Sequence, residues 1–81
     1  MIDDKVLKRV KKDFKSSERD EVLSILSELK REHVMAKSYD NWFNTHMAIL
    51  HLSKGDLDAV RHYTESAKSD FRDVIYWATQ E

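Results

Sequence analysis

The chain has no cysteine, no proline and a single glycine, Gly55, in 81 residues. The absence of cysteine excludes disulfide bonds, zinc sites built on thiolates and a cysteine nucleophile. One glycine is too few for a phosphate-binding loop or for a dinucleotide-binding fingerprint, since both motifs need several glycines. The composition therefore excludes several common classes of enzyme and metalloprotein before any pattern is considered.

Long apolar stretches are also absent. The longest uninterrupted run of apolar residues without an aromatic side chain is Met47–Leu50, and the run 74–78, which includes two aromatic residues, has only five, whereas a membrane-spanning helix needs about 20 such residues. The first residues, Ile2, Asp3 and Asp4 followed by lysines, do not resemble the apolar region of a signal peptide. We therefore expect a cytoplasmic protein, and the short length predicts one domain over residues 1–81.

The remaining pattern predicts an all-α protein. Glycine and proline are nearly absent, and apolar residues recur with the helical period of 3.6. We expect about five antiparallel helices, packed as a small helical-hairpin array that resembles a helical-repeat bundle. The expected helices span about residues 3–15, 17–32, 38–53 and 57–68, and the fifth starts at Ser69 or Asp70.

Helix ends can be predicted at several places. Ser17 and Asp20 have the spacing of a capping box at the start of the second helix. Gly55 is expected to end the third helix in a left-handed conformation, and Asp56 to cap the fourth. Residues 33–37 show no clear period and are expected to form a loop. The third helix is apolar nearly all round, which predicts that it lies at the centre of the domain.

Two segments of the sequence can be superimposed at an offset of 37 residues. They are residues 21–28 and 58–65, both amphipathic and helical in pattern. An offset of this size is typical of a helix-hairpin repeat. The match is chemical rather than literal, so both a repeat and a chance similarity between two amphipathic helices stay open.

The C-terminal half carries a recognisable pattern. Residues 47–57 read MAILHLSKGDL, and residues 67–75 read AKSDFRDVI. This half resembles a group of small uncharacterised bacterial proteins that share an apolar helix ending in Gly-Asp-Leu and a closing Asp-aromatic-Arg-Asp-Val-Leu/Ile helix. The resemblance covers about residues 45–78 and implies a bacterial, all-helical, intracellular protein. It implies no activity and no cofactor.

That closing motif has a structural interpretation as well. Asp70 is expected to accept hydrogen bonds from the free backbone N–H groups at the start of the last helix. Arg72 is expected to pair with an acidic residue of the third or fourth helix, while Phe71 and Val74 anchor the helix in the core.

Aromatic residues predict a binding surface. Tyr76 projects away from the apolar stripe of the last helix and Trp77 lies on its flank, while Tyr39 and Trp42 begin the third helix. Exposed aromatic side chains often mark a surface for a partner protein. We therefore expect a non-catalytic protein–protein interaction module with an unknown protein partner, and self-association as a homo-oligomer through the last helix is one form of this hypothesis.

Lysines near the N-terminus suggest an alternative function. The first fifteen residues carry six basic and three acidic residues, and the other 66 carry eight basic and twelve acidic residues. The basic first helix could bind nucleic acid, because lysines neutralise phosphates. A solvated helix face, with its lysines paired to acidic residues elsewhere, is the other interpretation. The lysines concerned are Lys5, Lys8, Lys11, Lys12 and Lys15.

A third hypothesis concerns His51. In histidine phosphotransfer domains, which are helical bundles, the phosphorylated histidine precedes a Lys-Gly pair at about the spacing of His51, Lys54 and Gly55. Those domains continue the helix past the glycine. Here Asp56 follows Gly55 and predicts that the helix stops and restarts, so phosphotransfer at His51 is the least favoured of the three functions.

Hydrolytic chemistry and metal binding find little support in the sequence. No serine lies in a nucleophile-elbow motif. His62 shares a helix face with Asp58 and Glu65, which is compatible with a divalent metal but more typical of a surface polar cluster. We expect no enzyme activity, no metal and no cofactor, and no association with a membrane.

Overall fold

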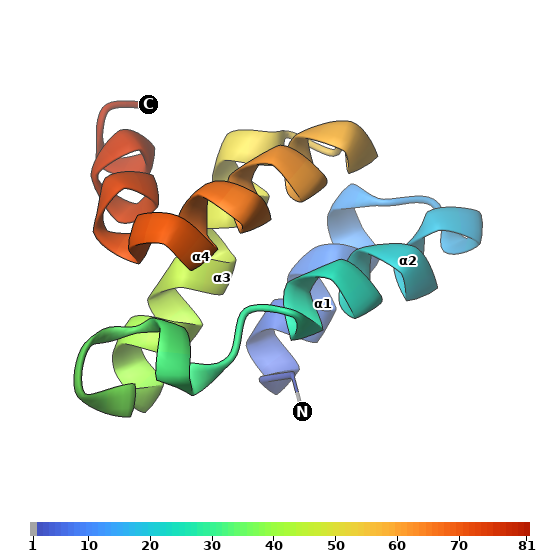
Figure 1. The fold of residues 1–81 in the computed structure, drawn as a ribbon. Coiled ribbons are helices and arrows are strands. Elements are labelled where there is room, and N and C mark those ends of the chain that lie inside the picture. The colour runs from blue at the N-terminus through green and yellow to red at the C-terminus, as the bar shows by residue number, and fades with distance from the viewer. Residues whose placement is uncertain (1) are drawn as a thin grey trace.

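A computed structural model describes residues 2–81 of the chain and is all-helical, with no strand in that range. The prediction of an all-α protein is therefore confirmed, although the structure has four α-helices and not about five. Figure 1 shows their order. The elements are α1 (Asp4–Asp13), α2 (Ser16–Ser27), the short 3-10 helices η1 (Arg31–His33) and η2 (Met35–Lys37), α3 (Tyr39–Ser53) and α4 (Leu57–Thr79).

The expected fifth helix is the last part of α4. Asp70 is the one residue inside α4 with non-helical angles, φ −155° and ψ 101°. The chain changes direction there, and the last turns of α4 run back toward the C-terminal end of α3 (Figure 1). The Asp70 carboxylate accepts a hydrogen bond from the backbone N–H of Arg72 at 3.1 Å, as its predicted capping role requires. Arg72 also pairs with Asp70 at 3.0 Å, at the start of its own segment, so the expected partner in α3 or in the part of α4 before the break is wrong.

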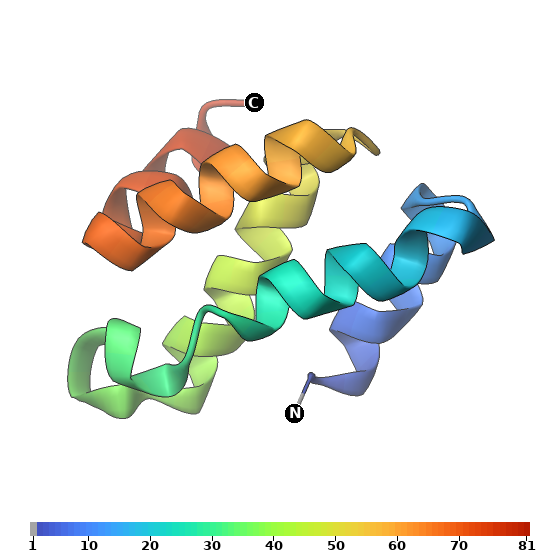
Figure 2. The same cartoon turned by 45° about the vertical axis from the view of Figure 1, so that its right-hand side comes forward.

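The central position predicted for the third helix is confirmed. In Figure 2 α3 crosses the middle of the molecule, with α4 on one side and α1 on the other. α2 and α4 run side by side in the same direction. Two ion pairs show this: Glu21 pairs with Arg61 near the start of the two helices, and Glu28 pairs with Lys68 further along. The fully buried aliphatic side chains, each at most 1 % exposed, come from all four helices and from the segment after α2: Val6, Val10, Val22, Leu26, Leu29, Ile49, Leu50, Val60, Ala67 and Val74.

α2 is the helix whose ends were predicted least well. It begins at Ser16, and no side chain caps it, so the capping box expected at Ser17 is absent. It ends at Ser27, five residues before the predicted end. The early end coincides with two hydrogen-bond donors from α3. The indole Nε1 of Trp42 donates to the carbonyl oxygen of Leu29 at 3.0 Å, and Nε2 of His46 lies 2.9 Å from that of Leu26.

The turn between α3 and α4 forms as the sequence predicts. Lys54 and Gly55 both have positive φ, 50° and 81°, and end α3. Asp56 then caps α4 by accepting hydrogen bonds from the backbone N–H groups of Asp58 and Ala59, at 2.9 and 3.4 Å.

The segment between α2 and α3 is irregular, as expected, apart from the two short 3-10 helices. At its end, Ser38 caps α3 through a 3.2 Å hydrogen bond from the N–H of Asn41. Over residues 2–81, none of the helices combines the length and the apolar content that crossing a membrane requires.

Candidate functional site

The four aromatic residues expected at a partner surface lie in two separate groups. Tyr39 and Trp42 are at the start of α3, and their rings are 5.2 Å apart. Trp77 instead packs near the other end of α3, where it lines a hollow together with Leu52. Thirteen residues of helix separate Tyr39 from Leu52, which corresponds to about 20 Å. The predicted residues therefore do not form one continuous surface.

Trp42 belongs to the core and not to the surface. Only 7 % of its side chain is exposed, and it packs with Val34 and Phe71 in a small apolar cluster. Its indole N–H is used by the hydrogen bond to Leu29. The prediction that Trp42 contributes to a partner surface is corrected accordingly.

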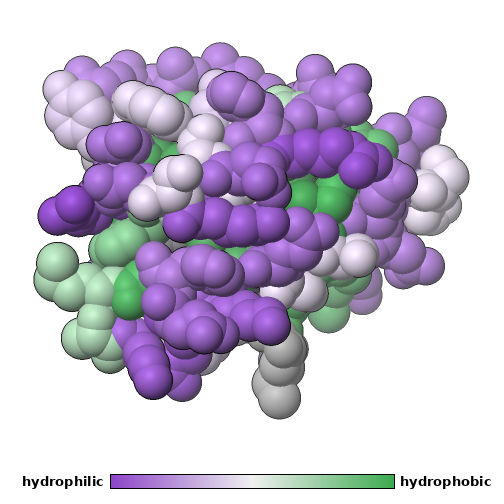
Figure 3. Space-filling model, viewed as in Figure 1, coloured by the Kyte–Doolittle hydropathy of each residue, from purple (hydrophilic) through white to green (hydrophobic). Residues whose placement is uncertain are grey.

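Tyr39 is exposed but already has partners within the chain. Its side chain is 45 % exposed, its hydroxyl donates a hydrogen bond to the carboxylate of Asp3, and the Arg31 guanidinium lies 5.8 Å from its ring. The hydrogen bond raises the pKa of Tyr39 and lowers the pKa of Asp3. Figure 3 shows hydrophobic side chains gathered over the neighbouring η1–η2 segment, where Met35 is 59 % exposed.

The second group contains Trp77 and Tyr76, and Tyr76 is more exposed than either aromatic residue of the first group. Tyr76 is 62 % and Trp77 39 % exposed. The Trp77 ring packs edge-on against Tyr63 with a centroid distance of 6.3 Å, and Tyr63 packs edge-on against His62 at 5.0 Å. We call these four residues, His62, Tyr63, Tyr76 and Trp77, the C-terminal aromatic surface.

A hollow of about 420 Å³ lies within this surface. Leu52, Tyr63 and Trp77 supply its apolar walls, and the polar lining comes from His62, Gln80 and Glu81. In the sequence, Tyr63 falls on the apolar stripe that Leu57, Val60 and Ala67 form at the helical period, and this pattern does not indicate a place in a hollow. No local signal reveals it, because it depends on the change of direction at Asp70.

An ion pair lies at the edge of the same hollow. Nζ of Lys54 is 2.8 Å from a carboxylate oxygen of Glu81. The pair raises the pKa of Lys54 and lowers the pKa of Glu81. Both groups are exposed to solvent, so the pair adds little to the stability of the fold. It places one positive and one negative group at the rim of the hollow.

Four of the predicted basic residues lie on one face of α1, and Lys15 follows as the residue before α2. The five lysines are Lys5, Lys8, Lys11, Lys12 and Lys15, which we call the lysine face; all five are exposed. They lie opposite the buried side chains of Val6, Val10 and Phe14. None of the five forms an ion pair with a carboxylate of residues 2–81. The interpretation in which acidic residues of the chain neutralise these lysines is therefore not supported.

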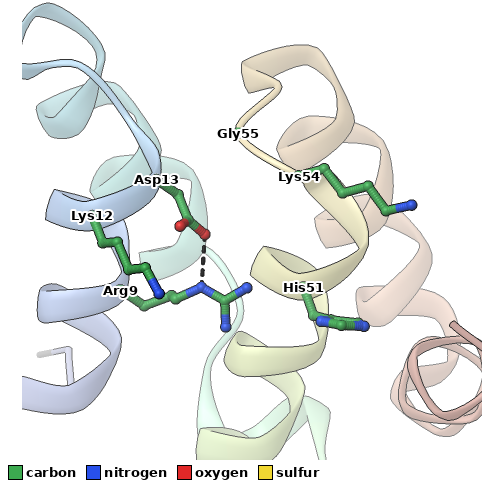
Figure 4. A pocket seen from close by; sticks show the side chains of 6 residues that line it. All are labelled: Arg9, Lys12, Asp13, His51, Lys54 and Gly55. Carbon is green, nitrogen blue, oxygen red and sulfur yellow. Dashed lines mark hydrogen bonds and ion pairs between the residues drawn. The ribbon is translucent and has the colours of Figure 1, made fainter.

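His51 is exposed in the last turn of α3 and lines a second hollow, of about 520 Å³. Figure 4 shows this hollow between α1 and the end of α3, with Arg9, Lys12 and Asp13 on the α1 side. α3 ends at Ser53, so the helix does not continue past Gly55 as it does in histidine phosphotransfer domains.

His46 is the one histidine that is completely buried. A carbonyl oxygen only accepts hydrogen bonds, so Nε2 of His46 carries the proton toward Leu26, while Nδ1 has no partner among residues 2–81. Burial lowers the pKa of His46, and the hydrogen bond to Leu26 opposes that effect. This side chain is part of the core and is not accessible to a ligand.

Metal binding gains no support from the structure. His62, Asp58 and Glu65 share a helix face in the sequence pattern, but the part of the chain from residue 2 onward has no group of three or more residues arranged to hold a metal ion.

Comparisons of the chain with protein-family models, with curated proteins and with solved structures give no match in any of the three.

Proposed function

We propose that the chain is a non-catalytic protein-interaction module that binds its partner through the C-terminal aromatic surface. The observation that carries this proposal is that the exposed Trp77 lines a hollow with apolar walls, while the more exposed Tyr76 precedes it on the same helical segment. Tyrosine and tryptophan are enriched among the residues that contribute most to binding at protein interfaces, because each combines a large apolar area with a polar atom.

The architecture supports a rigid binding surface. Leu52 lies on α3, Tyr63 on the first part of α4 and Trp77 on the part beyond Asp70. Three helical segments therefore hold the walls of the hollow, in what we propose to be a helical-hairpin array. A surface that is fixed before binding loses little conformational entropy when a partner docks.

The proposed occupant of the hollow is an apolar side chain from another protein. Its apolar part would pack between Tyr63 and Trp77, and the polar atoms of His62, Gln80 and Glu81 would form the rim. The bacterial cytoplasm as the setting of this interaction is also a proposal, and only the sequence resemblance supports it.

The test is a comparison of tagged variants in a pull-down from a bacterial lysate at high salt, read by mass spectrometry. Tyr76→Ser and Trp77→Ser remove the proposed contacts, and Met35→Ser removes an apolar side chain elsewhere that is about as exposed as Tyr76. A protein retained by the parent and by Met35→Ser, and lost from both aromatic variants, supports the proposal. Identical retention by all four proteins contradicts it.

Self-association is a separate outcome of this test. Light scattering over a range of protein concentrations reports the oligomeric state of the parent chain. A dimer that dissociates in Tyr76→Ser and Trp77→Ser, but not in Met35→Ser, would make a second copy of the chain the occupant.

Nucleic-acid binding is the second candidate function. It is favoured by the lysine face, whose five exposed amines have no ion-pair partner in residues 2–81. Fluorescence anisotropy with a labelled oligonucleotide separates this function from the first. Binding should weaken steeply with salt and disappear in a Lys8/Lys11/Lys15→Gln variant, while Tyr76→Ser should leave it unchanged.

A further inference from the structure

The hollow between α1 and the end of α3 has a basic lining and is distinct from the C-terminal aromatic surface. It has a volume of about 520 Å³, and four of its six lining residues carry basic groups: Arg9, Lys12, His51 and Lys54. Gly55 and Asp13 complete the lining. A hollow of this volume suits a small ligand, because small-molecule sites usually measure about 300–1,000 Å³.

Arg9 is the best-oriented cation in this hollow. Its Nε donates to the Asp13 carboxylate at 2.7 Å, one helical turn further along α1. Its two terminal nitrogens donate to no group within residues 2–81, and Figure 4 shows the guanidinium extending from α1 toward α3. Asp13 therefore fixes the plane of the guanidinium and leaves the terminal pair free for a ligand. That pair matches the spacing of two oxygens of a phosphate group.

Lys12 adds a second free cation on the same side of α1. It is exposed, lies three residues after Arg9, and forms no ion pair with a carboxylate of residues 2–81. The other two basic residues contribute less. Lys54 is paired with Glu81, and in Figure 4 the side chains of His51 and Lys54 extend away from α1.

The remaining lining fixes the shape of the hollow. An added Cβ on Gly55 would lie 3.0 Å from the backbone oxygen of Asp13, so the turn after α3 already touches the end of α1. Both residues belong to the lining, so this contact lies at the hollow. The turn of α3 that carries His51 provides the wall opposite Arg9.

We propose that this hollow binds the phosphate group of a small phosphate monoester, held by Arg9 and Lys12. A monoester carries close to two negative charges near neutral pH and three terminal oxygens. These features match one bidentate guanidinium and one ammonium. A phosphodiester inside a nucleic-acid strand carries a single charge, so it gains less from the same two cations. The proposal concerns reversible binding without phosphate transfer, and it does not depend on the proposed protein partner.

The test is an NMR titration of the ¹⁵N-labelled chain with inorganic phosphate, with ribose 5-phosphate, and with an oligonucleotide that has no terminal phosphate. We expect the first two probes to shift the signals of Arg9, including Nε–H, together with those of Lys12, His51 and Gly55. Stronger binding of ribose 5-phosphate than of phosphate would show that the sugar also contacts the hollow. Equal binding would assign the affinity to the phosphate group alone.

Variants identify the two cations. We expect Arg9→Gln to weaken binding of ribose 5-phosphate about tenfold, since it removes a charge-assisted pair of hydrogen bonds. Lys12→Gln should weaken binding about threefold and should not disturb folding, because the side chain is exposed. Lys8→Gln is the matched control: it removes the same charge from the same helix, outside the hollow, and should change affinity by less than about twofold.

Two results would overturn the proposal. One is equal binding by Lys8→Gln and Lys12→Gln, which would show that the charge of α1 acts without a defined site. The other is a stronger response to the oligonucleotide, centred on Lys8, Lys11 and Lys15, which would assign the basic surface to nucleic acid. Circular dichroism of each variant verifies that the helices remain folded.

Discussion

Gly55→Ala should destabilise the protein although it adds only one methyl group. Gly55 has φ +81°, a conformation in which an L-residue brings its Cβ close to the following carbonyl oxygen. The new Cβ would also lie 3.0 Å from the backbone oxygen of Asp13, the last residue of α1. Because that oxygen belongs to the main chain, no side-chain rotation relieves the contact.

The expected loss is about 1–2 kcal/mol. The left-handed conformation costs a non-glycine residue about 1–2 kcal/mol. Alanine offsets about 0.4–1 kcal/mol of this, because it reduces the conformational entropy of the unfolded chain. The contact with the backbone of α1 adds to the loss and returns the net effect to about 1–2 kcal/mol. For a chain of this size each kcal/mol corresponds to about 4–8 °C in melting temperature.

Urea and thermal unfolding followed by circular dichroism measure this loss. Lys54→Gly is the informative companion, because Lys54 also has positive φ, 50°, and should gain stability when glycine removes its strain. Glu81→Gln removes the Lys54–Glu81 ion pair without touching the turn, and so isolates the contribution of that pair. Unchanged or increased stability in Gly55→Ala would refute the reasoning, as would a loss of stability in Lys54→Gly after this correction.

Three further predictions concern the core. Leu26→Ala should lower the free energy of unfolding by about 2–5 kcal/mol in chemical denaturation, because Leu26 is completely buried. Thr64→Val should raise it by about 1 kcal/mol, since the buried hydroxyl of Thr64 has no hydrogen-bond partner within residues 2–81. Stability should also depend on pH through His46. Burial lowers the pKa of this histidine below its usual 6.5, so the unfolded chain binds the proton more readily. Stability is therefore complete above about pH 6.5 and falls below it. His46→Gln should flatten the pH dependence, and His62→Gln, an exposed control, should not.

The parts of the fold that follow local chemistry were predictable from the sequence. The end of α3 at Gly55 and the cap at Asp56 depend on residues that are adjacent in the chain, and both are present as expected. The buried position of α3 follows from its nearly continuous apolar surface. The break before the last turns of α4 was located to within one residue, at Asp70, although it interrupts one helix and does not separate two.

The aromatic part of the candidate site was only half predictable. Helical periodicity shows that Tyr76 points away from the core, and the structure agrees. Periodicity cannot show that Trp77 reaches Tyr63, because this contact needs the chain to reverse at Asp70. The burial of Trp42 was missed for a similar reason: its hydrogen-bond acceptor, Leu29, comes from the segment between α2 and η1, thirteen residues earlier in the chain.

The basic hollow depends on the way two distant segments meet. The run of lysines in α1 is visible in the sequence, but the ion pair that orients Arg9 and the approach of Gly55 to Asp13 are not. The spacing of Arg9 and Asp13 at i and i+4 was the one local signal available.

Because glycine and proline are scarce, side chains must supply the hydrogen-bond donors for the last carbonyl groups of some helices. Carbonyl groups at the C-terminal end of a helix have no partner within that helix, and proteins commonly end helices with a left-handed glycine. This chain has one glycine and uses it after α3. At the end of α1, the guanidinium of Arg19 in α2 donates to the carbonyl oxygens of Lys11 and Phe14, at 2.8 and 2.9 Å.

The end of α2 is satisfied in the same way by the next helix. Trp42 and His46, one turn apart on α3, direct their ring nitrogens to the carbonyl oxygens of Leu29 and Leu26. Each of the first two helices is thus ended by polar groups from the helix that follows it, so these ends cannot be read from local sequence. The same arrangement explains why a tryptophan and a histidine are buried in so small a core. Trp42→Phe should then cost more stability than the lost apolar area alone predicts, because it leaves the Leu29 carbonyl without its donor.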